Sequence, residues 1–225
     1  QNNHISINFN KDLKHSISNL TKIGSGTLKA TNFQLPLIPL ILNVTAGKLS
    51  IENFNTSVNS NIMGNITVAS GATLEAQGDV EANLLISGSL VIGGDTTGVL
   101  NTKGLLHLLP SSNFYLRIKD KVSDVITLDG QSMLNGNLIV THTNYVPTLE
   151  DQFIFIKSLN SIGGSFNSYP EGLSYNINGE KFRISYKSGT GNDVSLTYKD
   201  YTTIWENSKW SNGNPDYTKD AIIKE

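Results

Sequence analysis

Short apolar pairs separated by one residue follow glycines along much of the chain. Three clear examples are GKLSI at Gly47, GNITV at Gly64 and GSLVI at Gly88. Residues two positions apart share one face of a β-strand, whereas a helix would place its apolar residues three or four positions apart. The pattern therefore predicts short strands whose outer residues point into a core.

These units recur at nearly constant intervals. The chain advances 17 residues from Gly71 to Gly88 and 16 residues from Gly88 to Gly104. A strand of about three to five residues is not stable alone, but coils that stack and pair can bury one continuous apolar column. The pattern predicts a parallel β-solenoid with about 16 to 24 residues per coil. Glycine would serve at corners, where φ is positive or backbones pass closely.

A β-sandwich is the alternative fold, because it also contains many short strands joined by turns. We favour the solenoid because the glycine units recur in the same order within each interval.

The rhythm changes after residue 145, where aromatic residues become frequent. Asn178-Gly179 lies between two alternating segments and predicts a type I′ hairpin turn. Residues 188–192 predict a second, longer turn. We therefore expect an antiparallel meander that closes the C-terminal end of the solenoid and protects its open edge.

Four regions follow from this pattern. Residues 1–44 would form the N-terminal strands or cap of the solenoid, and residues 45–144 its parallel coils. Residues 145–200 would form a capping coil and the antiparallel meander. Residues 201–225 would begin a following module or a linker.

Composition and charge exclude some kinds of chemistry and limit the classes of partner. Only 16% of the residues are charged and the net charge is −2, which gives no indication of a nucleic-acid partner. The absence of cysteine excludes disulfides, thiolate metal sites and a thiol nucleophile. No apolar run reaches the roughly 18 residues of a membrane span, so we expect no membrane insertion. Because the chain begins with Gln1 and shows no signal peptide, we expect a mature or excised piece of a longer product.

A family resemblance extends over about residues 45 to 225. The run from Ile66 to Ile118 resembles the autotransporter-associated β-helical repeat of bacterial surface proteins. The run from Asp124 to Phe155 is similar to a motif that closes many such passengers, with Glu150 where glycine is usual. Residues 202–225 resemble the opening of modules in large secreted surface proteins of the Bacteroidetes, often exported by type IX secretion.

The resemblance implies a right-handed parallel β-helix and an extracellular or cell-surface location. It implies no catalytic residue, because the family shares none. Asp95-Thr96-Thr97 resembles the O-glycosylation acceptor of the Bacteroidetes, which makes Thr96 a candidate modification site.

Carboxylates are the main candidates for enzymatic chemistry. Glycoside hydrolysis uses two carboxyl groups about 5 to 10 Å apart, and neighbouring coils lie about 4.8 Å apart, so acids one coil apart would qualify. The candidate acids are Glu75, Asp79, Glu81, Asp120, Asp124 and Asp129. We interpret them as solvated turn residues and expect a protein that is not an enzyme. The four histidines are too dispersed to predict a metal site.

Two further kinds of binding residue stand out. Asp79, Glu81 and Asp193 offer hard oxygen ligands in turns, the type that calcium prefers. Trp205 and Trp210 would either stack on a glycan or anchor the first strands of a next module, and the second interpretation is favoured. No other cofactor is expected.

These features together predict a non-enzymatic extracellular β-solenoid segment of a large bacterial cell-surface adhesin. It would act as a stiff spacer, as a weak multivalent module that binds glycans or surfaces, or as both. A β-helix polysaccharide lyase or glycoside hydrolase is the alternative, and a type IX secretion cargo segment captured with its secretion machinery is another. An enzyme would gather at least three acids, or a lysine or arginine, from neighbouring coils in a long groove, whereas a spacer would scatter them.

Overall fold

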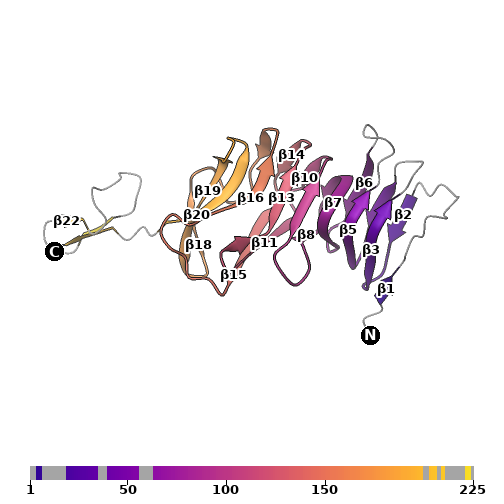
Figure 1. Ribbon diagram of the computed structural model, residues 1–225, viewed down its shortest axis with the longest axis horizontal. Helices are drawn as coiled ribbons and strands as arrows, with labels where there is room; N and C mark the ends of the chain where they lie inside the picture. The colour runs from indigo at the N-terminus through magenta and orange to yellow at the C-terminus, as the bar shows by residue number, and fades with distance from the viewer. Residues whose placement is uncertain are drawn as a thin grey trace.

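The structure is a computed structural model that describes residues 4–6, 19–34, 40–55, 63–199, 203–206, 209–210 and 221–223. Within these ranges the protein is all-β and contains no helix. Its strands stack side by side along one long axis (Figure 1). The predicted β-solenoid is confirmed, with about five turns.

One strand shows how a coil is built. Strand β7, Thr73–Ile86, pairs in parallel with three later strands in succession: its first segment with β8, its middle with β9 and its last with β10. A single coil therefore presents three faces. Gly78, with φ at +73°, lies between the first two segments and allows the chain to turn there.

The first face is a parallel ladder that makes five steps from β3 to β15. Its strands are β1 (His4–Ser6), β3 (Thr27–Gln34), β5 (Lys48–Asn55), the start of β7, β8 (Ser89–Ile92), β11 (Asn113–Lys119) and β15 (Asn137–Thr143). The second face contains the middle of β7 with β9 (Val99–Thr102), β13 (Val125–Leu128) and β16 (Gln152–Ser158).

The third face is also parallel throughout. Its strands are β2 (Asn19–Lys22), β4 (Ile41–Val44), β6 (Gly64–Val68), the end of β7, β10 (Leu106–Leu108), β14 (Ser132–Leu134) and β17 (Ile162–Gly164). Parallel pairing thus extends to both sides of residues 45–144. Two facing antiparallel layers would be needed for a β-sandwich, so that alternative is wrong.

The apolar pairs of the sequence fill the interior. The strand that one coil contributes to a face is called a rung. Ile66, Leu84 and Leu106 are register partners on successive rungs of the third face, and each is fully buried. The alternation within strands is as predicted, because Leu90 and Ile92 point inward while Val91 between them is partly exposed. Successive coils therefore bury one continuous apolar column.

Glycines mark the places where coils approach most closely. A Cβ atom added at Gly88 would lie 2.2 Å from the carbonyl oxygen of Ala72, and one at Gly104 would lie 2.1 Å from that of Ala82. No side chain fits at such distances without moving the backbone. This close approach explains the glycine at these two corners, whereas Gly71 has open space around it and a φ of +81°.

Asparagines stack on the outside at matching positions of neighbouring rungs. Asn137 Nδ2 donates to Asn113 Oδ1 over 3.1 Å, and Asn167 Nδ2 donates to Asn137 Oδ1 over 3.0 Å. Another such pair joins Asn83 to Asn65, 18 residues earlier, whereas Asn137 and Asn167 lie 30 residues apart. The number of residues per coil thus varies, while the pairing register between neighbouring coils stays the same.

An antiparallel meander closes the C-terminal end, as predicted. Strands β18 (Ser174–Ile177), β19 (Glu180–Ser188) and β20 (Asp193–Tyr198) pair in order, and β20 also pairs antiparallel with β16. Asn178 and Gly179 both have positive φ, as a type I′ turn requires. Beneath the meander, the ring of Phe114 stacks with those of Phe155 and Phe166. The meander and β2 lie at opposite ends of the solenoid (Figure 1).

The remaining strands are short. β12 (Val122–Ser123) forms a small antiparallel pair with β11. β21 (Thr203–Glu206), β22 (Lys209–Trp210) and β23 (Ala221–Ile223) form a separate three-stranded sheet. No helix in the described part of the chain has the length and apolarity needed to span a membrane.

Candidate functional site

Outward side chains of three consecutive rungs on the first face form a groove, called here the first groove. Lys29, Ser50 and Glu75 occupy matching register positions on β3, β5 and β7, and Thr31, Glu52 and Gln77 form a second row beside them. The cavity has a volume of about 320 Å³, and Gly93 and Gly94 line it after β8. Its complete lining is Lys29, Ala30, Thr31, Ser50, Ile51, Glu52, Glu75, Ala76, Gln77, Gly93 and Gly94.

Glu75 lies within a network of donors in this groove. Lys48 Nζ donates to Glu75 Oε2 over 2.9 Å, and Ser50 Oγ donates to Glu75 Oε1 over 2.8 Å. Partial burial alone would raise the pKa of Glu75, but these hydrogen bonds and the charges of Lys48 and Lys29 hold that pKa below its usual value. Glu75 is therefore an ionised acceptor at neutral pH and is unsuited to act as a general acid.

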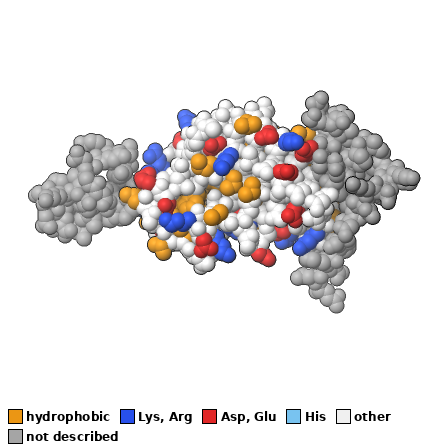
Figure 2. Space-filling view, viewed as in Figure 1, with side chains coloured by type: hydrophobic (Ala, Val, Ile, Leu, Met, Phe, Trp, Pro, Cys, Tyr) orange, Lys and Arg blue, Asp and Glu red, His pale blue; other side chains and the backbone are white. Residues whose placement is uncertain are grey.

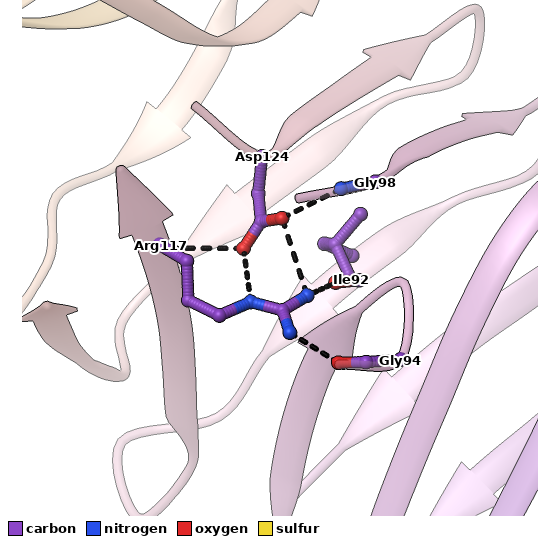
Figure 3. Close-up of polar contacts among 5 residues, drawn as sticks. All are labelled: Ile92, Gly94, Gly98, Arg117 and Asp124. Carbon is purple, nitrogen blue, oxygen red and sulfur yellow. Dashed lines mark hydrogen bonds and ion pairs between the residues drawn. The ribbon is translucent and has the colours of Figure 1, made fainter. Parts of the chain in front are cut away.

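An ion pair between the partly exposed Arg117 and the buried Asp124 contacts the chain next to Gly94, which lines the first groove (Figure 3). Asp124 has no exposed surface, and its Oδ2 accepts hydrogen bonds from Arg117 Nε at 3.1 Å and from the Arg117 backbone N at 2.9 Å. Its Oδ1 accepts from the backbone N of Gly98 at 2.8 Å. The Arg117 guanidinium also donates to the carbonyl oxygens of Ile92 and Gly94. The interpretation of Asp124 as a solvated turn residue is therefore wrong.

This arrangement, the Arg117–Asp124 latch, holds both ends of the loop formed by residues 93–98. Arg117 binds the start of the loop and Asp124 binds its end, so the loop is fixed by a neighbouring coil. The loop carries Gly94 against Glu75, where an added Cβ would lie 4.0 Å from Glu75 Oε1. The absence of a side chain at Gly94 leaves Glu75 accessible from the groove.

A second groove lies on the second face and has a volume of about 290 Å³. Asp79, Glu81 and Asp129 line it together with Lys103, so it collects three of the predicted acids and a lysine from neighbouring coils. Lys103 Nζ donates to Glu81 Oε1, and Asn101 Nδ2 donates to Asp79 Oδ1 over 2.9 Å. In composition this matches the arrangement expected of an enzyme.

The electrostatics of the second groove restrict its chemistry. The hydrogen bond and charge of Glu81 raise the pKa of Lys103, and the charges of Asp129 and Asp79 add to this effect. Lys103 therefore stays protonated at neutral pH and cannot accept a proton from a substrate. Asp120, the remaining predicted acid, lies apart in the exposed turn between β11 and β12, with φ at +51°.

The three predicted calcium ligands do not share one place. Asp79 and Glu81 lie within strand β7 and not in a turn as predicted, and they line the second groove, whereas Asp193 begins β20 and is almost fully buried. Asp193 accepts from the backbone N of Ser158 at 2.9 Å and from that of Thr190 at 3.1 Å. In the part of the chain that the structure describes, no group of three or more His, Cys, Asp or Glu side chains could hold a metal ion. Calcium binding stays a prediction.

The other predicted site residues are placed less fully. Trp205 and Trp210 are backbone register partners in the antiparallel β21–β22 pair, but their side chains lie outside what the structure describes. Glycan contact by these residues stays a prediction. Thr96 is exposed in the 93–98 loop, and its O-glycosylation stays a prediction.

Several groove residues were missed from the sequence, although a signal existed. Lys48-Leu49-Ser50-Ile51-Glu52 and Thr73-Leu74-Glu75-Ala76-Gln77 align by their inward apolar residues, and the structure pairs them in that register. Such an alignment would have placed Ser50 beside Glu75 and Glu52 beside Gln77. Arg117 had no comparable signal, because its partner carbonyls lie at the end of β8 and in the irregular loop that follows it.

Comparison of the chain with protein-family models and with curated proteins found no match.

Proposed function

We propose that this chain is a stiff spacer, a β-solenoid segment of an extracellular adhesin that holds other parts of a surface protein apart. The observation that carries the proposal is the unbroken parallel ladder from β3 to β15 on the first face, matched on the third face from β2 to β17. Each added coil lengthens such a stack by about 4.8 Å. Length is thus set by the number of coils.

Stiffness follows from how the coils contact one another. Every inner rung pairs with the rung before and the rung after it, and the buried column runs through all of them without a break. Side chains add cross-rung contacts, such as Lys48 with Glu75 and Asn113 with Asn137. Bending the stack would open these contacts on one side.

The surface is suited to a spacer in a second respect. Acidic and basic side chains are interspersed along the viewed face and are not gathered by sign (Figure 2). With a net charge of only −2, the chain would not be drawn strongly to polyanions or polycations.

Force spectroscopy tests the spacer directly. The chain is fused between two reference domains and stretched in an optical trap. We expect no gradual lengthening at low force, followed by abrupt unfolding, because the column has to break cooperatively. Leu84→Asp, which places a charge in the column, should lower the unfolding force, while the outward substitution Leu85→Asp should change it little. Gradual extension of the unaltered chain from the lowest forces would contradict the proposal.

A carbohydrate-active enzyme is the second candidate, and the second groove is the observation that favours it. Asp79 and Glu81, both on β7, converge there with Asp129, which directly follows β13, so two carboxylates could flank a bound glycosidic bond. The test is release of reducing sugar or of unsaturated products from a panel of polysaccharides. An enzyme would lose this release in Asp79→Asn or Asp129→Asn, whereas the spacer proposal expects no release by the unaltered chain.

A further inference from the structure

The first groove has features that the spacer role does not require. A spacer needs the buried column and the ladders, but not an open cavity of about 320 Å³ whose end wall is fixed by the ion pair of Arg117 with the buried Asp124. Taking the Asp124 charge out of water costs free energy, which its pairing with Arg117 offsets, and the pair holds a defined geometry. Here the geometry they define is that of the 93–98 loop.

The lining of the groove indicates the class of ligand. Hydroxyl, amide, carboxylate and ammonium groups from Thr31, Ser50, Glu52, Gln77 and Lys29 point outward from three rungs. They supply both hydrogen-bond donors and acceptors, which is what a polyhydroxylated molecule pairs with. The rungs repeat about every 4.8 Å, which is close to the length of one sugar unit.

The charges in and around the groove favour a neutral ligand. Glu52 and Glu75 line it, and Lys29 together with Lys48, the partner of Glu75, balances them. An acidic ligand would meet two carboxylates, and a cationic one would compete with Lys48 for Glu75. A neutral ligand leaves the Lys48–Glu75 pair intact while still accepting and donating hydrogen bonds.

The latch acts as the positioning element. Arg117 and Asp124 do not line the groove, but they hold both ends of the 93–98 loop (Figure 3). They thereby keep Gly94 next to Glu75. A wall that is already in place does not have to be ordered when a ligand arrives, which lowers the entropic cost of binding.

We propose that the first groove binds a segment of a neutral oligosaccharide along β3, β5 and β7, with the 93–98 loop as its end wall. Glu75, Glu52 and Gln77 contact the sugar hydroxyls, and Gly94 leaves room for the terminal ring. This site is independent of the spacer role, so either proposal can fail without the other.

Isothermal titration calorimetry with a panel of defined oligosaccharides tests the site. The neutral members are oligomers of glucose, mannose, xylose and galactose, and an oligogalacturonate serves as the acidic comparator. We expect at least one neutral oligosaccharide to bind more tightly than the acidic one. Failure of every neutral member to bind, or tighter binding of the acidic member, would overturn the proposal.

Variants locate the binding. Gly94→Tyr places a ring in the groove next to Glu75 and should weaken binding by about tenfold or more. The matched control Thr96→Tyr adds the same ring to the exposed part of the loop and should leave the affinity unchanged. Gln77→Leu, which removes an amide from the lining without altering charge, should also weaken binding. Equal affinity in Gly94→Tyr, Gln77→Leu and the unaltered chain would place the sugar elsewhere and contradict the proposal.

Discussion

Gly104 lies where two coils pass each other most closely. An added Cβ would come within 3 Å of three backbone atoms of Ala82 and Asn83, none of which can swing aside as a side chain would. Such glycines therefore mark corners where the backbones of two coils lie too close together for a side chain. For this reason the glycine pattern predicts corners of the coils from the sequence alone.

Substitution of Gly104 by alanine should destabilise the protein by about 1 to 3 kcal/mol, the cost of forcing an extra methyl group into a filled space. Gly94→Ala is the control, because the nearest atom to its added Cβ is 4.0 Å away and its φ is not positive. Urea denaturation of the two variants measures the difference. Equal stabilities would show that the corners have room to relax.

Arg117 and Asp124 form the most buried ion pair among the salt bridges of the described residues. Arg117→Met would leave the Asp124 carboxylate buried without its guanidinium partner, and we expect a loss of about 3 kcal/mol or more. The exposed pair of Lys103 and Glu81 offers the comparison, and Lys103→Gln should change stability little. A loss in Lys103→Gln as large as that in Arg117→Met would contradict the special role of the latch.

The segment from Tyr145 to Asp151 links β15 to β16 and is held together by one carboxylate. Asp151 Oδ2 accepts from Tyr145 Oη at 2.6 Å, from Thr148 Oγ1 at 2.7 Å and from the Thr148 backbone N at 2.8 Å. The hydrogen bond from Tyr145, followed by those from Thr148, holds the pKa of Asp151 well below its usual value. The element therefore depends on an ionised Asp151.

This dependence predicts how stability changes with pH. Because the pKa of Asp151 is lower in the folded than in the unfolded chain, its contribution is present above about pH 4 and is lost as the pH falls below that value. In Asp151→Asn, the urea midpoint should fall less steeply from about pH 6 to about pH 2 than in the unaltered chain. Asp120→Asn, in the exposed turn after β11, should keep the original slope. Identical slopes in all three proteins would rule out the assigned role of Asp151.

Features of strands and turns that depend on local sequence patterns were predicted. Alternation gave the strands and their inward faces, and Asn178-Gly179 gave the β18–β19 turn. The extent of β7 was not predicted, because Gly78 inside it turns the chain without ending the strand. Glu150 departs from the glycine of the resembled motif at a position where φ is +68°, so the backbone conformation is kept without the residue that favours it.

The candidate grooves were predicted only in part, for a physical reason. The groove contacts join residues 22 to 27 positions apart, and these separations depend on loop lengths that vary from coil to coil. Glu75, Asp79 and Glu81 were identified by residue type. Their partners Lys48, Asn101 and Lys103 follow only once the register is known.

In the whole molecule, each coil adds one rung to the stack. Coils differ in length, with 18 residues between Asn65 and Asn83 and 24 between Asn113 and Asn137, yet each contributes a single step to the stack. Both proposals depend on this property, because it sets the length of the spacer and the spacing of the side chains in the first groove.

The most direct test is a distance between spin labels at Lys29→Cys and Ile139→Cys, measured by pulsed electron resonance. The chain contains no native cysteine, and these positions are five steps apart in one outward column of the first face. We expect a narrow distribution centred at about 24 Å, before the length of the labels is added. Deleting residues 65–82, one whole coil, should keep the distribution narrow and shorten the distance by about 4.8 Å. A broad distribution in the unaltered chain, or an unchanged distance after the deletion, would contradict the stack of coils.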